Sequence, residues 1–192
     1  MAKVVFVHGY SDHVGRYYGF FPHLASSGIQ VFGWDQRGWG RSVHKPSDRG
    51  ETGPTSRVVA DIAAFIEDKL AAAPVGAPLF VMGHSMGGAG AIYLGVKHPS
   101  IWAGVGAIAP AHAPAGIFPQ NYSLAPAKGI PMIIVQGDKD PLVPVEGVRQ
   151  WIDQMKELHI THQYIERAGG DHGTVLTDVP AVIAFFSQHS KK

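Results

Sequence analysis

Short apolar runs alternate with amphipathic segments along the whole chain. The apolar runs are about four to eight residues long and rich in aliphatic side chains, which is typical of buried strands in a parallel sheet. The strands predicted in this way are residues 4–7, 30–34, 79–85, 102–109, 132–136 and 163–166. Helices are predicted between them at residues 17–27, 56–70 and 87–97, and in segments that begin at Pro144 and Pro180.

The clearest predicted helix is the one at residues 56–70. Its apolar residues recur three or four positions apart and so form one stripe, made of Val58, Ile62, Phe65, Ile66 and Leu70. Because strands and helices alternate without an internal repeat or a linker, we expect a single α/β domain over residues 1–192. Its sheet should have about six parallel strands with helices on both faces, and ligands should bind beyond the carboxyl ends of the strands.

The stretch of residues 79–94 carries the strongest chemical signal. A buried strand runs into Gly83-His84-Ser85-Met86-Gly87, and a segment rich in glycine and alanine follows that can pack closely as a helix. This is the G-x-S-x-G pattern in its required order of strand, turn and helix. A turn this tight strains the serine backbone, so the flanking residues must lack bulk. Ser85 is therefore the candidate nucleophile, and a glycine-rich turn without a catalytic role is the alternative.

A serine hydroxyl is a weak nucleophile at neutral pH and needs a base that is itself oriented by a carboxylate. In one known chain order the acid and then the histidine follow the serine. Asp138 and Asp140 both follow a predicted strand; Asp140 is preferred because Asp138 comes almost directly after the strand and can cap the turn. His172 is the preferred base because its flanking glycines let the loop bend, and His112 is the alternative.

The composition narrows the possible functions. A formal net charge of +1 on 192 residues provides no electrostatic basis for binding nucleic acid or an anionic membrane. The absence of cysteine excludes disulfides, thiol catalysis and thiolate metal sites. Among the eleven histidines, the pairs His8/His13 and His159/His162 have no third ligand nearby and no H-E-x-x-H pattern. We therefore expect no metal and no cofactor.

Targeting and membrane-spanning segments are not apparent in the sequence. The first apolar run ends at His8 and is too short for a signal-peptide core, and no segment approaches the length of a membrane span. We therefore expect a cytoplasmic protein without stable membrane insertion. The sequence does not indicate an oligomeric state.

Five motifs together resemble the α/β-hydrolase superfamily across nearly the whole chain; they are residues 4–10, 35–42, 83–87, 137–140 and 169–173. The front half, with His8-Gly9 and Asp35-Gln36-Arg37-Gly38-Trp39-Gly40-Arg41-Ser42, resembles monoacylglycerol lipases. The back half, from Ser85 through Gly137-Asp138-Lys139-Asp140 to His172, resembles bacterial esterases related to polyester depolymerases and prolyl-oligopeptidase-type enzymes. One hypothesis is that the chain joins two lineages near residues 55–78.

The resemblance implies a role for each matching position. Ser85 would be the nucleophile, Asp140 the acid and His172 the base, and the backbone amides of Tyr10 and Met86 would form the oxyanion hole. The implied activity is hydrolysis of carboxylic esters, either short-chain acyl esters or small acylglycerols, through an acyl-enzyme. Amide or peptide hydrolysis by the same residues is the alternative, and a non-catalytic binding protein is a third interpretation.

Residues 111–130 occupy the place where monoacylglycerol lipases carry a helical lid. They are irregular, rich in proline, alanine and glycine, and too few for a substantial lid. We therefore expect an open site that prefers short, water-soluble esters, and a small ester is the partner that the sequence indicates. The candidate pocket side chains are Trp39, Phe118, Tyr122 and Leu142.

Overall fold

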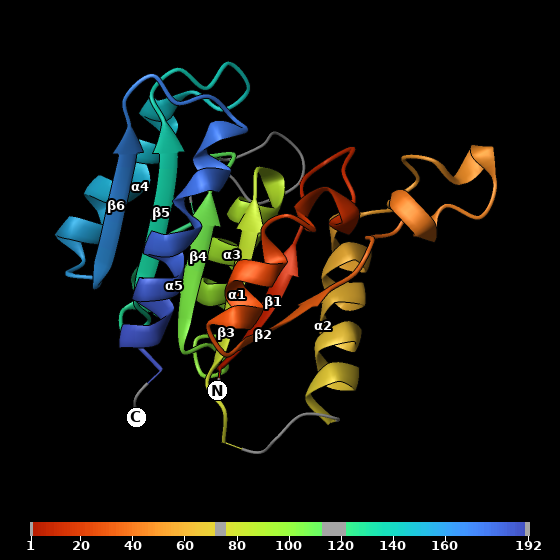
Figure 1. The fold of residues 1–192 in the computed structure, drawn as a ribbon, viewed down its shortest axis with the longest axis horizontal. Helices are drawn as coiled ribbons and strands as arrows, with labels where there is room; N and C mark the ends of the chain where they lie inside the picture. The colour runs from red at the N-terminus through yellow and green to blue at the C-terminus, as the bar shows by residue number, and fades with distance from the viewer. Residues whose placement is uncertain (1, 72–75, 113–121, 191–192) are drawn as a thin grey trace.

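Six parallel strands form the centre of the structure, a computed structural model that describes residues 2–71, 76–112 and 122–190 (Figure 1). Within these residues the strands are β1 (Ala2–Val7), β2 (Ile29–Gly33), β3 (Leu79–His84), β4 (Gly104–Ile108), β5 (Met132–Gly137) and β6 (His162–Arg167). Their order across the sheet is β2-β1-β3-β4-β5-β6, and every neighbouring pair is parallel. The carboxyl ends of the strands therefore meet at one edge, the upper edge in Figure 1.

Helices cover both faces of the sheet. Those in the described residues are α1 (Phe21–Ser26), α2 (Thr55–Ala71), α3 (Met86–Lys97), α4 (Val145–Glu157) and α5 (Val179–Gln188). α1 and α5 pack on one face, and α2, α3 and α4 pack on the other (Figure 1). The predicted fold class, a parallel sheet between two layers of helices, is confirmed.

Within strand β1, residues 4–7 form an uninterrupted apolar run because both faces of the strand are covered. Side chains alternate between the two faces of a strand. Val5 and Val7 belong to the core on the α2–α4 side, whereas Val4 and Phe6 belong to the core on the α1–α5 side. Because both faces are buried along residues 4–7, apolar side chains are favoured on both.

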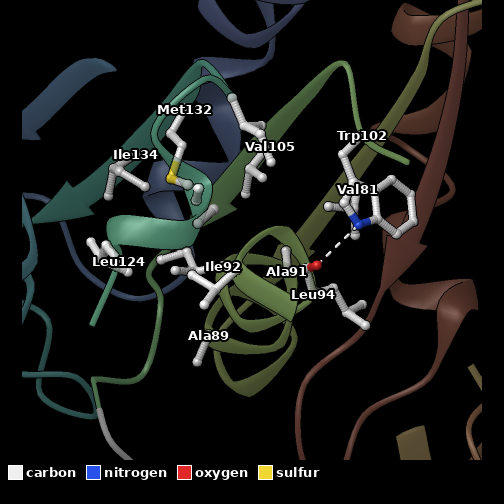
Figure 2. Close-up of a cluster of buried hydrophobic side chains, with 14 of the residues drawn as sticks. Val81, Ala89, Ala91, Ile92, Leu94, Trp102, Val105, Leu124, Met132 and Ile134 are labelled. Carbon is white, nitrogen blue, oxygen red and sulfur yellow. Dashed lines mark hydrogen bonds between the residues drawn. The ribbon is translucent and has the colours of Figure 1, made fainter. Parts of the chain in front are cut away.

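Helix α3 lies very close to the sheet because its residues are small. A Cβ added at Gly95 would lie 2.8 Å from Val105 Cγ2 on β4. At the neighbouring residue of α3, Leu94, the backbone oxygen accepts a hydrogen bond of 3.1 Å from the Trp102 indole, drawn as a dashed line in Figure 2. Ile92 packs into the same cluster of buried side chains (Figure 2). This packing holds α3 against the sheet, and the candidate nucleophile lies just before the first residue of this helix.

The helix predicted at residues 17–27 is wrong at its start. Residues Val14–Tyr17 form a separate 3-10 turn, and α1 begins only at Phe21. Pro22 lies in the first turn of α1, where its missing N–H and fixed φ are tolerated, so the proline marks the beginning of the helix. As a result Tyr17 lies outside the helix and is buried, with 1% of its surface exposed.

Two further expectations concern the chain as a whole. In the described residues, no helix is both long enough and apolar enough to cross a membrane. The predicted lid position falls largely on residues 113–121, which lie outside the described residues, and Phe118 lies there too.

Candidate active site

Ser85 occupies the turn between β3 and α3 with a left-handed backbone. Its φ is 58° and its ψ is −124°, and such a conformation costs a residue other than glycine about 1–3 kcal/mol. The flanking glycines are required, because a Cβ on Gly83 would lie 2.1 Å from Gly87 O and one on Gly87 would lie 2.0 Å from Val7 O. The Ser85 amide donates to Ile108 O at 2.9 Å, which ties the turn to β4. The tight turn expected from the sequence is thus present.

Asp140 and His172 meet at the carboxyl edge of the sheet. His172 Nδ1 lies 2.7 Å from Asp140 Oδ2, and the aspartate side chain is fully buried. The other carboxylate oxygen, Oδ1, accepts the amides of Leu142 at 2.8 Å and Val143 at 2.9 Å. Both oxygens are therefore held, so the carboxylate can orient the imidazole with its proton on Nδ1.

Asp138, the alternative acid, holds a different part of the same loop. Its Oδ1 accepts the Gly169 amide at 2.6 Å, and the Lys139 amide donates to Gly170 O at 3.0 Å. Gly169 has a φ of 71°, a conformation that glycine adopts without strain. Asp138 thus anchors the loop that carries His172, whereas Asp140 contacts the imidazole itself.

His172 lies beside the serine turn. Its ring centroid is 4.5 Å from that of His84, the residue before Ser85, and His84 Nε2 lies 2.9 Å from His172 O. In the described part of the chain, no hydrogen bond joins Ser85 to His172. Bonds of this kind often tighten only when a substrate binds. The three candidate residues therefore share one region, with the acid and base in direct contact.

The two candidate oxyanion amides belong to Met86, the residue after the serine, and to Tyr10, the residue after Gly9. Met86 is the first residue of α3, and an amide in the first turn of a helix has no partner within the helix. Tyr10 follows Gly9, and a Cβ on Gly9 would lie 3.0 Å from Ser85 Cβ. Glycine at position 9 thus lets the backbone before Tyr10 approach the serine closely.

A cavity of about 200 Å³ lies next to these amides. Gly9, Tyr10 and Met86 form part of its wall, and apolar side chains of α2 and α3 form another part, including Val58, Ile62, Tyr93 and Leu94. The sequence assigned Val58 and Ile62 to a buried stripe of α2, but their role in a cavity wall was missed. Periodicity identifies the apolar face of a helix. It does not show whether neighbouring elements pack fully against that face or leave a cavity beside it.

The candidate pocket side chains lie in different places. Trp39 lines the cavity, and its ring centroid is 4.9 Å from that of Tyr10. Tyr122 does not line it but packs against Tyr93, which does, with ring centroids 5.6 Å apart. Leu142 is 70% exposed and is not part of the wall. Among the described candidates, Trp39 is thus the one in position to contact a ligand in this cavity.

His8 braces the loop that carries Tyr10. Its Nδ1 lies 2.8 Å from Gly9 O, and its Nε2 accepts the Gln36 amide at 2.8 Å. The Gln36 side-chain amide in turn donates to His8 O at 2.7 Å. Both ring nitrogens of His8 are thus engaged within the protein. His112, the alternative base, packs instead against Trp151, with ring centroids 4.8 Å apart.

His84 should make the stability of the fold depend on pH. Burial lowers its pKa from 6.5 to about 4. Between these values the unfolded chain binds a proton at this histidine that the folded chain does not, so stability falls as the pH falls through this window. The shift corresponds to about 3 kcal/mol. We expect the free energy of unfolding from urea titrations to rise between pH 4 and 6.5, and to rise less steeply in His84→Gln.

The exposed His98 is the matched site for this test. His98→Gln also removes a histidine, and the free energy of unfolding of this variant should change with pH as steeply as that of the wild type. An equal slope in His84→Gln and wild type would show that His84 is not the source of the acid sensitivity.

Comparison with known proteins places the chain among enzymes. The family model described as serine aminopeptidase, S33, matches residues 1–125. A Schizosaccharomyces pombe relative is 42% identical over 113 residues, which are 57% of this chain and 29% of the relative. The monoacylglycerol lipase of Mycolicibacterium smegmatis is 31% identical over 153 residues, 76% of this chain and 48% of the relative. The aligned part is thus less than half the length of either relative.

A solved structure shows the same fold. The chain resembles a soluble variant of monoglyceride lipase from Saccharomyces cerevisiae in complex with a substrate analog, with a TM-score of 0.84. The likeness covers 100% of this chain and 88% of that structure, at 16% sequence identity. At this identity the likeness is evidence for the fold alone.

Proposed function

The chain belongs to the family described as serine aminopeptidase, S33, within the α/β-hydrolase superfamily, and from this premise we propose that it hydrolyses carboxylic esters through an acyl-enzyme on Ser85. The observation that carries the proposal is the 2.7 Å contact between Asp140 Oδ2 and His172 Nδ1. This contact lies at the carboxyl edge of the sheet, where Ser85 occupies its strained turn.

In the proposed acylation step, His172 Nε2 takes the proton of the Ser85 hydroxyl as Oγ attacks the carbonyl carbon of the ester. Asp140 keeps the other ring proton on Nδ1 and stabilises the imidazolium that forms. The imidazolium then gives its proton to the leaving alcohol, and the acyl group stays on Ser85.

In the proposed deacylation step, water enters, gives its proton to His172 and attacks the acyl carbon, and Ser85 regains its proton as the acid leaves. In both steps a negative charge develops on the carbonyl oxygen. We assign the amides of Tyr10 and Met86 as the donors to this oxygen, and the loss of one such donor typically costs about 3–4 kcal/mol of transition-state stabilisation.

Small acyl groups fit the cavity better than long ones. Its volume of about 200 Å³ lies below the roughly 300–1,000 Å³ of pockets that bind drug-sized ligands. An engineered apolar cavity of about 150 Å³ in another protein holds one benzene molecule. We therefore assign short-chain acyl esters and small acylglycerols as the substrate class, in keeping with the relatives that are named monoacylglycerol lipases.

Peptide hydrolysis is the second candidate, because the family description names an aminopeptidase. An aminopeptidase must recognise a substrate ammonium group, for which a carboxylate is the usual partner. Among the described residues that line the cavity, none is aspartate or glutamate. Assaying a p-nitrophenyl ester beside the anilide of the same acid separates the two candidates; we expect turnover of the ester and little of the anilide.

The rate should depend on acyl-chain length in a defined way. Each methylene buried in an apolar wall contributes about 0.8 kcal/mol, so kcat/KM for p-nitrophenyl esters should rise about three- to fourfold per methylene from acetyl to butyryl. Beyond roughly hexanoyl it should level off and then fall as the cavity fills. A continued rise to long chains, with a jump above the solubility limit of the ester, would contradict the assigned substrate class.

Val58→Phe should shift the preference toward acetyl, because Val58 lines the cavity and is only half-buried. Ala60→Phe is the control, since it adds the same ring at an exposed position of α2 that does not line the cavity. The control should keep the wild-type preference. If both variants keep it, this cavity is not the acyl site.

A further inference from the structure

A buried chain of polar side chains runs beside the candidate active site and has no role in the chemistry proposed above. The Tyr17 hydroxyl donates to Asp12 Oδ2 at 2.5 Å and lies 2.9 Å from His84 Nδ1. Tyr17 is 1%, His84 5% and Asp12 8% exposed. Buried polar groups are costly unless they are paired, so three of them in a row need an explanation.

The far end of this chain is the backbone of the candidate base. His84 Nε2 lies 2.9 Å from His172 O, and because a carbonyl oxygen only accepts, His84 Nε2 is the donor. Burial lowers the pKa of His84 to about 4, so near neutral pH the ring is uncharged and carries its one proton on Nε2. This tautomer leaves Nδ1 without a proton, so the single proton of the Tyr17 hydroxyl is shared between Asp12 Oδ2 and His84 Nδ1.

Contacts at different points hold the backbone of the loop that carries His172. Asp138 and the Lys139 amide bind Gly169 and Gly170 and so tie the first part of the loop to β5. His84, the last residue of β3, holds the carbonyl of His172 itself. The contact at residue 172 restrains a part of the backbone that the contacts at residues 169 and 170 do not reach, and a shift there would move the imidazole relative to Ser85.

We propose that His84 is a positioning residue that holds His172 in place beside Ser85. Tyr17 and Asp12 keep the His84 ring in the orientation in which Nε2 donates to His172 O. The proposal rests on the proposed function for its kinetic test. His84 also packs against the His172 ring, with centroids 4.5 Å apart and planes at 46°, so it restrains both the backbone and the ring.

The charges around His84 fit this role. It faces Asp12, Tyr17, His172 and Asp140, and Asp12 is paired in turn with Arg16 at 2.8 Å. During acylation His172 becomes an imidazolium. A neutral His84 at van der Waals distance does not repel that charge, whereas a charged neighbour would raise the energy of the transition state.

Three variants in the full chain test the proposal: His84→Ala, His84→Gln and Tyr17→Phe. A misplacement of about 1 Å in an active site costs about 10²-fold in rate, so His84→Ala should lower kcat for p-nitrophenyl butyrate by about 10- to 100-fold. KM should stay within about twofold, because none of the three side chains of the buried chain lines the cavity. His84→Gln keeps a donor at the same reach and should restore kcat to within about fivefold. Tyr17→Phe should lower kcat by about three- to tenfold.

A second readout does not depend on turnover. The Nδ1–H proton of His172, bonded to Asp140, should appear as a downfield resonance in the proton NMR spectrum of the resting protein. It should broaden or shift in His84→Ala and Tyr17→Phe and return in His84→Gln. All assays are made where circular dichroism shows each variant to be folded, so that a loss of stability is not mistaken for a loss of positioning.

The outcomes are separable. Wild-type kcat and an unchanged resonance in His84→Ala and Tyr17→Phe would overturn the proposal, and so would a loss of kcat in His84→Ala that His84→Gln fails to rescue. If His84→Ala does not fold, a low kcat in Tyr17→Phe beside a near-normal kcat in His84→Gln supports the proposal, and the reverse order overturns it. If the wild type neither hydrolyses esters nor reacts with a fluorophosphonate, the proposed function fails, and the resonance alone decides the role of His84.

Discussion

Ser85→Ala should lower kcat for p-nitrophenyl butyrate by about 10⁴- to 10⁶-fold, because the acyl-enzyme cannot form without the hydroxyl. The variant should also lose covalent labelling by a fluorophosphonate, observed as the loss of a mass shift in the intact protein. Stability should stay close to that of the wild type, since alanine and serine meet the same backbone strain at a φ of 58°.

Ser11→Ala is the matched control for this prediction. Ser11 is also a serine with a left-handed backbone, with a φ of 51°, but it is exposed on the loop after β1. It should keep full activity and full labelling. Labelling that persists in Ser85→Ala, or that disappears in Ser11→Ala, would mean that Ser85 is not the nucleophile.

Asp140→Asn should lower kcat by about 10⁴-fold, the second largest effect we expect. An amide at this position donates as well as accepts, so it favours the imidazole tautomer with its proton on Nε2, which cannot take the proton of Ser85. The asparagine oxygen can still accept the hydrogen bonds that the Leu142 and Val143 amides donate to Asp140 Oδ1. The loop should therefore stay in place. Steady-state kinetics at neutral pH measure the loss.

Asp138→Asn tests the alternative assignment under the same conditions. Asp138 accepts the Gly169 amide through Oδ1, and an asparagine oxygen can make that bond equally well. We expect its kcat to stay within about threefold of the wild type. A large loss in Asp138→Asn together with a small loss in Asp140→Asn would exchange the roles of the two residues.

The sheet could be predicted from the sequence because its signals are local. A run such as Val4–Val7 is apolar on both faces, which only a doubly covered strand requires, and α2 shows its period in five residues. The turn at Ser85 was equally accessible, since a strained serine needs small neighbours at Gly83 and Gly87. The preference for Asp140 over Asp138 followed the same logic, because an aspartate directly after a strand tends to cap the turn.

The rest of the site could not be predicted because it depends on distant partners. Tyr17 and His84 are 67 positions apart in the chain, and nothing near either residue in the sequence indicates that they meet. The start of α1 was predicted wrongly because the spacing of apolar residues was used without the helix-start signal of Pro22. The catalytic roles, the extent of the domain over residues 1–192 and the cytoplasmic location stay predictions.

The order of the strands has a consequence for how the chain is made. β1 lies between β2 and β3, so β1 and β2 are both synthesised before residues 79–84, which form the second neighbour of β1. β2 ends at Gly33 and β3 ends at His84, so at about 5–20 residues per second the gap between the two lasts roughly 3 to 10 s. During that time the edge of β1 that later pairs with β3 has unpaired backbone N–H and C=O groups. Other chains and chaperones bind edges of this kind. A strand that is paired on both sides in the finished sheet is therefore paired on only one side while this part of the chain is being made.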